Sequence, residues 1–80
     1  MKRIIIDNGQ CLVMNPDSIY VFYSGHKSHI RAIVGKEEYV LTNDMAPKAA
    51  EILMVLILEK IKDDNNDFNG NIIIDIEALR

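Results

Sequence analysis

His26 and His29, two histidines three positions apart, are the residues whose types and spacing come closest to a chemical site. Imidazole is a common metal ligand, but a metal site needs several converging ligands, and structural zinc sites usually combine pairs of Cys and His residues. The single cysteine, Cys11, is the only additional soft ligand, and nothing in the sequence brings it to the histidines. We therefore interpret the histidines as surface residues and expect neither a metal nor another cofactor.

The same stretch carries the one local concentration of basic charge. An exposed hairpin over residues 26–31 could contact a phosphate backbone through His26, Lys27, His29 and Arg31. The whole chain, however, has nine Lys and Arg residues against twelve Asp and Glu residues, and it lacks the broad basic footprint of nucleic-acid-binding proteins. A nucleic-acid-binding regulator is therefore the alternative interpretation and not the preferred one.

The sequence contains nucleophiles but no pattern that would activate one of them. Ser18, Ser24, Ser28 and Cys11 are available, but a catalytic triad also needs a base and an orienting acid. No G-x-S-x-G elbow and no glycine-rich phosphate loop occurs. Cys11 falls in an apolar segment, where we interpret it as a structural residue. We expect no enzyme activity and no catalytic residue.

Short runs of strand-forming residues, separated by turns, occupy the first part of the chain. Ile4–Ile6 is followed by Asn8-Gly9, a hairpin signal in which both residues tolerate the positive φ of a type I′ turn. Further strand patterns cover residues 10–14, 18–24, 29–34 and 38–42. Because the connections are short, we expect an antiparallel meander of about five strands in which sequential neighbours pair.

The hydrophobic period then changes to that of a helix, from about Asp44 to Lys62. Asn43 or Asp44 is the expected cap, and Pro47 is acceptable in the opening turn, where its missing N–H costs little. We expect this helix to pack across one face of the sheet. The expected core face holds Ala46, Ala49, Ala50, Leu53, Leu56, Ile57 and Ile61.

Apolar side chains extend well beyond that core face. Ile52 flanks it on one side, Met54 and Leu58 flank it on the other, and Val55 lies among the charged residues. The apolar arc spans roughly 240°, about twice what a helix on one sheet requires. Either the meander and the C-terminal segment enclose the helix between them, or a second copy covers the surplus. We favour a two-fold homodimer, the commonest closed assembly.

The C-terminal segment supplies one more strand, residues 72–76, which we expect to pair at a sheet edge, either its own or a neighbour's. The acidic run 63–67 is interpreted as a solvated loop, since it lacks the ligand spacing of a calcium loop. A long loop over 63–71 would permit strand exchange between copies. The expected interface residues are Ile52, Met54, Val55, Leu58, Ile72 and Ile74.

With 80 residues, the chain fits a single small α+β domain spanning residues 1–80. A lone cysteine fits a reducing compartment, and no apolar run approaches the roughly 18 residues that span a bilayer. The initial Met1-Lys2-Arg3 is followed by too short an apolar run for a signal peptide. We therefore expect a cytoplasmic protein without a membrane segment.

Three stretches carry a resemblance: residues 12–19 (LVMNPDSI), residues 39–41 (YVL) and residues 49–57 (AAEILMVLI). Together they resemble a group of small uncharacterised proteins of Gram-positive bacteria and their prophages and mobile elements. The resemblance covers roughly residues 4–62, and residues 53–58 are more apolar here than in that group. It implies an accessory or interaction role, and no activity or functional residue. We expect a protein–protein interaction module that self-associates through residues 44–62 and 72–76, without catalysis.

Overall fold

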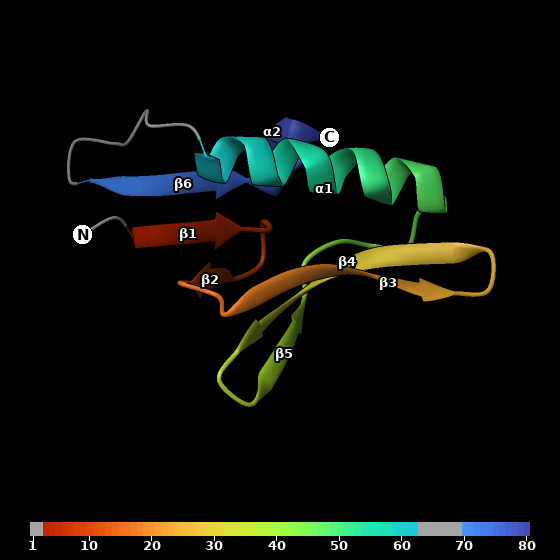
Figure 1. Cartoon of the computed structure of the whole chain (residues 1–80), viewed down its shortest axis with the longest axis horizontal. Helices are drawn as coiled ribbons and strands as arrows, with labels where there is room; N and C mark the ends of the chain where they lie inside the picture. Colours follow the sequence, from red (N-terminus) through yellow and green to blue (C-terminus); the bar gives the residue numbers. More distant parts are fainter. Residues whose placement is uncertain (1–2, 63–69) are drawn as a thin grey trace.

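The computed structural model describes residues 3–62 and 70–80 of the chain. The α+β class is confirmed, since this part of the chain forms six strands in two three-stranded sheets together with one long helix (Figure 1). The elements follow the order β1 (Arg3–Asp7), β2 (Leu12–Met14), β3 (Ser18–Ser24), β4 (Lys27–Val34), β5 (Glu37–Val40), α1 (Pro47–Lys62), β6 (Asn71–Asp75) and α2 (Ile76–Leu79).

The first sheet has the strand order β2-β1-β6. The predicted hairpin of β1 and β2 is confirmed, but its connection is not a type I′ turn. Gly9 has a positive φ of 90°, whereas Asn8 has none. Instead, Asn8 Oδ1 accepts hydrogen bonds from the backbone N–H groups of Gln10 at 2.9 Å and Cys11 at 2.8 Å. A side-chain-stabilised loop therefore joins the two strands.

β6 pairs in parallel with the other edge of β1, along the whole strand. The predicted strand over residues 72–76 is therefore present, shifted by one residue, at an edge of its own chain's sheet. Asp75 ends the strand, and its Oδ1 accepts hydrogen bonds from the N–H groups of Glu77 at 3.1 Å and Ala78 at 3.4 Å. This cap begins α2 at Ile76, a short helix that the sequence analysis missed.

The second sheet has the order β3-β4-β5 and is antiparallel throughout, so the expected meander is divided between two sheets. The division falls between β2 and β3, where Asn15 has a φ of 48° and Pro16 has no N–H to donate. Asn15 closes the first sheet, because its Oδ1 accepts from the Ile4 N–H at 2.9 Å. Asp17 opens the second sheet by donating its N–H to the Ile33 carbonyl at 2.7 Å.

α1 ends where predicted but begins at Pro47, so the predicted start and the proposed caps, Asn43 and Asp44, precede the helix. Met45 instead exchanges two backbone hydrogen bonds of 2.8 Å with Ser28. Because Met45 is paired with β4 in an extended bridge, it is not part of the helix. Pro47 then suits the first helical position, where an N–H has no intrahelical partner.

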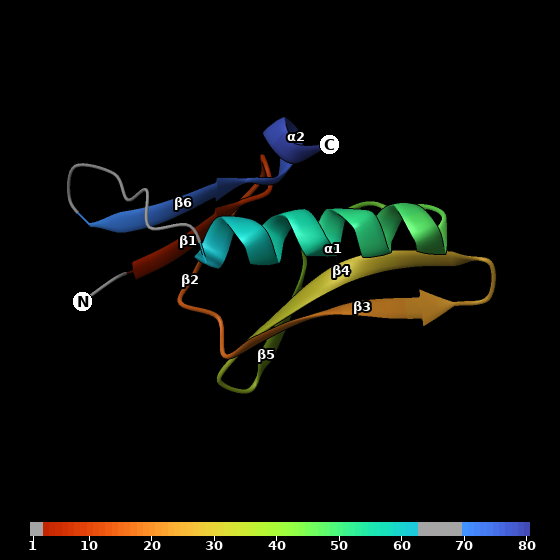
Figure 2. The same cartoon turned by 45° about the horizontal axis from the view of Figure 1, so that its top comes forward.

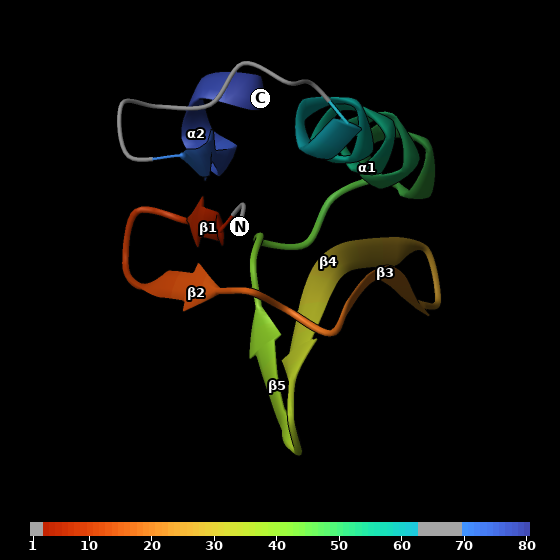
Figure 3. The same ribbon diagram turned by 60° about the vertical axis from the view of Figure 1, so that its left-hand side comes forward.

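α1 lies between the two sheets, as Figure 2 shows. It contacts β3 and β4 of the second sheet on one side, and β6 and α2 on the other (Figure 3). Ala50, Leu53 and Ile57 are its buried residues. The helix therefore contacts both the meander and the C-terminal segment, but its outer side is left uncovered by them. The core cluster consists of Ile6, Val13, Ile30, Ala32, Leu41, Leu53, Ile57, Ile72, Ile74 and Ile76.

This core includes two residues that the sequence analysis assigned to an interface. Ile72 is 3% exposed and Ile74 is fully buried, so the prediction that their side chains meet a partner is wrong. Strands alternate their side chains between two faces, and the shared face of Ile72 and Ile74 is the one that points inward. The acidic run 63–67, and most of the loop considered for strand exchange, lie outside the described residues.

Candidate functional site

Three large aliphatic side chains remain exposed on α1 although both sheets contact this helix. Ile52 is 55% exposed, Val55 is 53% exposed and Leu58 is 43% exposed. Met54, predicted to lie with them, is half-buried and packs against the core. The surplus apolar surface expected from the helical period is therefore present, although both sheets contact the helix.

An apolar groove continues this surface toward the C-terminal end of the chain. The groove has a volume of about 320 Å³ and runs between α1 and α2. Met45, Ala49, Ile52, Leu56 and Leu79 line it. Ile52 thus belongs both to the groove and to the exposed face of α1. The contribution of Leu79 was not predicted from the sequence, because α2 was not expected.

A second apolar surface lies on the outer face of the first sheet. The strand register aligns Met14, Ile5 and Ile73 in one row across β2, β1 and β6. Met14 is 45% exposed and Ile73 is 48% exposed. Ile73 is therefore the large apolar side chain that β6 presents to solvent. Its alternation with Ile72 and Ile74 was the signal that could have identified it.

The basic segment forms part of the outward face of the second sheet. Lys27, His29 and Arg31 alternate along β4 with the buried residues Ser28 and Ile30. Those three residues therefore share the face that points away from α1. His26 lies in the turn between β3 and β4 and is exposed. Three of the four predicted nucleic-acid contacts are thus brought together.

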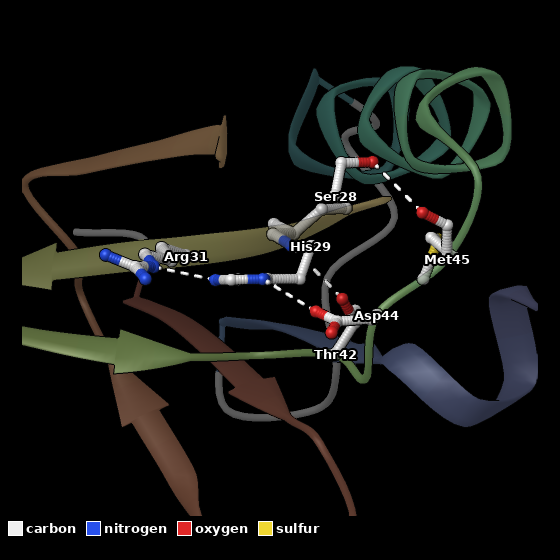
Figure 4. Close-up of polar contacts among 7 residues, drawn as sticks. Ser28, His29, Arg31, Thr42, Asp44 and Met45 are labelled. Atoms are coloured by element: carbon white, nitrogen blue, oxygen red, sulfur yellow. Dashed lines mark hydrogen bonds and ion pairs between the residues drawn. The ribbon is translucent and has the colours of Figure 1, made fainter. Parts of the chain in front are cut away.

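Carboxylates from other elements reach these basic side chains. Arg31 Nε donates a hydrogen bond of 2.7 Å to His29 Nε2 (Figure 4). His29 Nδ1 in turn lies 3.1 Å from Asp44 Oδ1. An Arg31 terminal nitrogen lies 3.7 Å from Glu38 Oε2. The predicted patch is therefore a mixed network, in which two acidic side chains offset its positive charge.

Arg31 also covers the aromatic ring beside it. Its guanidinium carbon lies 3.8 Å from the centroid of the Phe22 ring, and Phe22 pairs with His29 across the strands. A planar cation at this distance over a ring makes a favourable cation–π contact. The sequence did not predict the contacts of Phe22, Glu38 and Asp44, because only the tertiary structure brings these residues to the basic side chains.

A polar hollow of about 590 Å³ lies between the β1–β2 loop and α2. Its lining includes Asn8, Gln10, Thr42, Glu77 and Arg80. Across residues 3–62 and 70–80, no three His, Cys, Asp or Glu side chains are grouped so that they could hold a metal ion.

The position and exposure of Cys11 differ from those predicted. It was predicted to lie in an apolar strand, but it lies in the loop before β2 and is exposed. The loop holds it in this position because the Cys11 N–H donates to Asn8 Oδ1. None of the predicted nucleophiles is joined to a histidine by a hydrogen bond among the described residues.

The three tyrosines of the chain each donate a hydrogen bond to a glutamate, which raises the pKa of Tyr20, Tyr23 and Tyr39 above the ordinary value of about 10. We expect the folded protein to ionise its phenols at higher pH than the urea-unfolded chain, as followed by ultraviolet absorbance. The stabilisation is present below pH 10 and is lost as the pH rises through the folded pKa values.

The cause of the raised tyrosine pKa can be tested at Tyr23, because its hydroxyl donates to Glu51 Oε1 on α1 at 2.8 Å. The substitution Glu51→Gln replaces the carboxylate that accepts this hydrogen bond and removes the charge beside the phenolate, so we expect it to return the pKa of Tyr23 toward its ordinary value. Identical titrations of the folded and unfolded chains would contradict the geometry.

Comparison with known proteins finds no matching family model, curated protein or solved structure. The resemblance to small proteins of Gram-positive bacteria and their mobile elements therefore stays a prediction. None of the helices in the described part of the chain combines the length and apolar character that passage through a bilayer requires.

Proposed function

We propose that this chain is a protein–protein interaction module without catalytic activity, which self-associates through the exposed face of α1 and the region of β6. The supporting observation is the exposure of Ile52, Val55 and Leu58 on a helix that already contacts both sheets. Removing such side chains from water is favourable by about 25 cal/mol per Å² of apolar area. A cytoplasmic location and an accessory role in a bacterial mobile element are part of the same proposal.

The exposed row on the first sheet extends the proposal to β6. Ile73 takes the place of Ile72 and Ile74 as the apolar side chain that this strand can offer to a partner. β6 is also an edge strand of the first sheet in the described part of the chain. Edge strands of this kind are common sites of association between chains.

The test is the molar mass in solution. Light scattering after size-exclusion chromatography is expected to give about twice the 9.1 kDa of one chain at micromolar concentration. The substitutions Val55→Glu and Leu58→Glu place a carboxylate in the proposed contact, where its loss of hydration opposes association. We expect both variants to be monomers with unchanged circular dichroism.

Val40→Glu is the matched control, since Val40 is also 53% exposed but lies on β5, on the outward face of the second sheet. It introduces the same charge and should leave the mass at the dimer value. A wild-type mass of one chain at every concentration, or a Val55→Glu variant that stays dimeric, would contradict the proposal.

A second candidate function is the binding of single-stranded nucleic acid by the outward face of β4. Lys27, His29 and Arg31 share that face with Phe22, and aromatic rings beside basic side chains are typical of such surfaces. Fluorescence anisotropy with a labelled oligonucleotide should show affinity that falls steeply with salt and with Lys27→Glu. An absence of binding at low salt would exclude this candidate.

A further inference from the structure

Four exposed residues of α1 follow the 4-3-4 spacing of a helix–helix seam: Lys48, Ile52, Val55 and Glu59. At 100° per residue, their directions around the helix axis fall within about 60° of one another. The same arithmetic places this seam roughly 160° from the mean direction of the buried Ala50, Leu53 and Ile57. The seam therefore points almost directly away from the core, with a basic end, an apolar centre and an acidic end.

The charges of this seam are opposite to those that favour an isolated helix. A helix carries partial positive charge at its N-terminal end and partial negative charge at its C-terminal end. Lys48 nevertheless lies in the first turn of α1, which has no acidic residue, and Glu59 lies near the other end, immediately before the last-turn residues Lys60 and Lys62, whose charges do suit the dipole. Neither residue forms an ion pair with another side chain in the described ranges. The helix dipole by itself therefore does not favour these two charges at their positions.

We propose that a second copy of this chain covers the seam, with the two α1 helices antiparallel about a two-fold axis. This inference rests on the proposed self-association through α1. Lys48 and Glu59 are equally distant from the midpoint of the seam, and so are Ile52 and Val55. An antiparallel pair centred there places each Lys48 beside Glu59 of the partner copy and each Ile52 beside Val55 of the partner copy.

In a parallel pair, each charged residue would instead lie beside the same residue of the partner copy. Two lysines would then meet at one end and two glutamates at the other. Like charges in direct contact are repulsive, whereas complementary ends fix the orientation of a helix pair. Glu51 does not disturb the seam, because its carboxylate accepts the hydrogen bond from Tyr23 on β3. The charges of Lys48 and Glu59 in the seam thus favour an antiparallel second copy over a parallel one in register.

Charge exchange tests the inference directly. Lys48→Glu alone and Glu59→Lys alone each place like charges together at both ends of the antiparallel pair. We expect each single variant to raise the dimer dissociation constant about tenfold or more at low salt, and less at high salt. The double variant Lys48→Glu/Glu59→Lys restores complementary ends and should return the constant to within about threefold of wild type, as measured by sedimentation equilibrium. Each substitution suits the helix dipole, so unfolding would not explain the losses.

A cross-link tests the orientation with a different readout. In a Cys11→Ser background, oxidation of a mixture of the Lys48→Cys and Glu59→Cys chains should give a mixed disulfide-linked dimer. Neither chain should link to itself, because like positions of antiparallel helices would lie about 16 Å apart along the axis, beyond disulfide reach. In a parallel pair, by contrast, each chain would link to itself.

The outcomes separate this inference from the proposed function. A wild-type chain that is monomeric at all concentrations overturns both. A wild-type dimer that is unaffected by the single charge reversals, or that the double variant does not restore, overturns the antiparallel seam alone. Self-linking of the Lys48→Cys chain likewise overturns the orientation and leaves self-association through α1 standing.

Discussion

Replacing Ile74 by alanine is expected to lower the free energy of unfolding by about 2–5 kcal/mol, the usual cost of truncating a buried isoleucine. Ile74 is fully buried in β6 and forms a row with Ile6 and Val13 in the centre of the first sheet. Truncation removes buried apolar surface and leaves a cavity that rigid strands cannot close. Urea unfolding followed by circular dichroism measures the change.

The adjacent residue provides the control, because Ile73 has the same side chain in the same strand but is 48% exposed. We expect Ile73→Ala to change the stability of the monomer by about 0.5 kcal/mol or less. Small domains have a thin stability margin, so Ile74→Ala should leave a substantial unfolded fraction at moderate temperature. Equal effects of the two substitutions would contradict the inward orientation of Ile74.

Replacing Ala50 by leucine is expected to destabilise the fold by about 1–3 kcal/mol or more, for the opposite reason. Ala50 is fully buried in the first turns of α1, where the helix runs against the second sheet. A larger side chain at this position must displace the helix or adopt a strained rotamer. Thermal unfolding should show the loss as a melting temperature lower by several degrees.

The matched control is Ala49→Leu, on the neighbouring residue, which is exposed at the mouth of the apolar groove. Alanine and leucine are both good helix formers, so helix propensity contributes little to the comparison. We expect Ala49→Leu to leave the melting temperature of the monomer nearly unchanged. A stable Ala50→Leu variant would show that α1 is not held closely against the sheet at this point.

The local elements of the fold were largely predictable from neighbouring residues. Asn8-Gly9 identified the first hairpin, and the helical period located α1 to within three residues at its start. The start was missed because Met45 pairs with Ser28, a contact that helix propensity and capping signals do not contain. Asp75 has the residue type of a helix N-cap and could have indicated α2. The short helix was missed because the strand pattern before it was extended through Ile76.

The candidate site was predictable in part. The excess apolar arc of α1 identified Ile52, Val55 and Leu58, and all three are exposed. The interface assignment of Ile72 and Ile74 was wrong, since which face of a strand is buried depends on what packs against it. The contacts of Asp44 with His29 and of Glu38 with Arg31 depended likewise on the meeting of distant segments.

The sequence by itself determined the periodicity of each segment, the turns at its glycine, asparagine and proline residues, and the surplus of apolar side chains on α1. These properties follow from the backbone preferences and side-chain patterns of adjacent residues. Only the tertiary structure decided that β6 lies beside β1, that the strands divide into two sheets, and which face of β6 is buried. Those outcomes depend on pairing between residues far apart in the chain, where the hydrophobic pattern permits several partners and packing selects one.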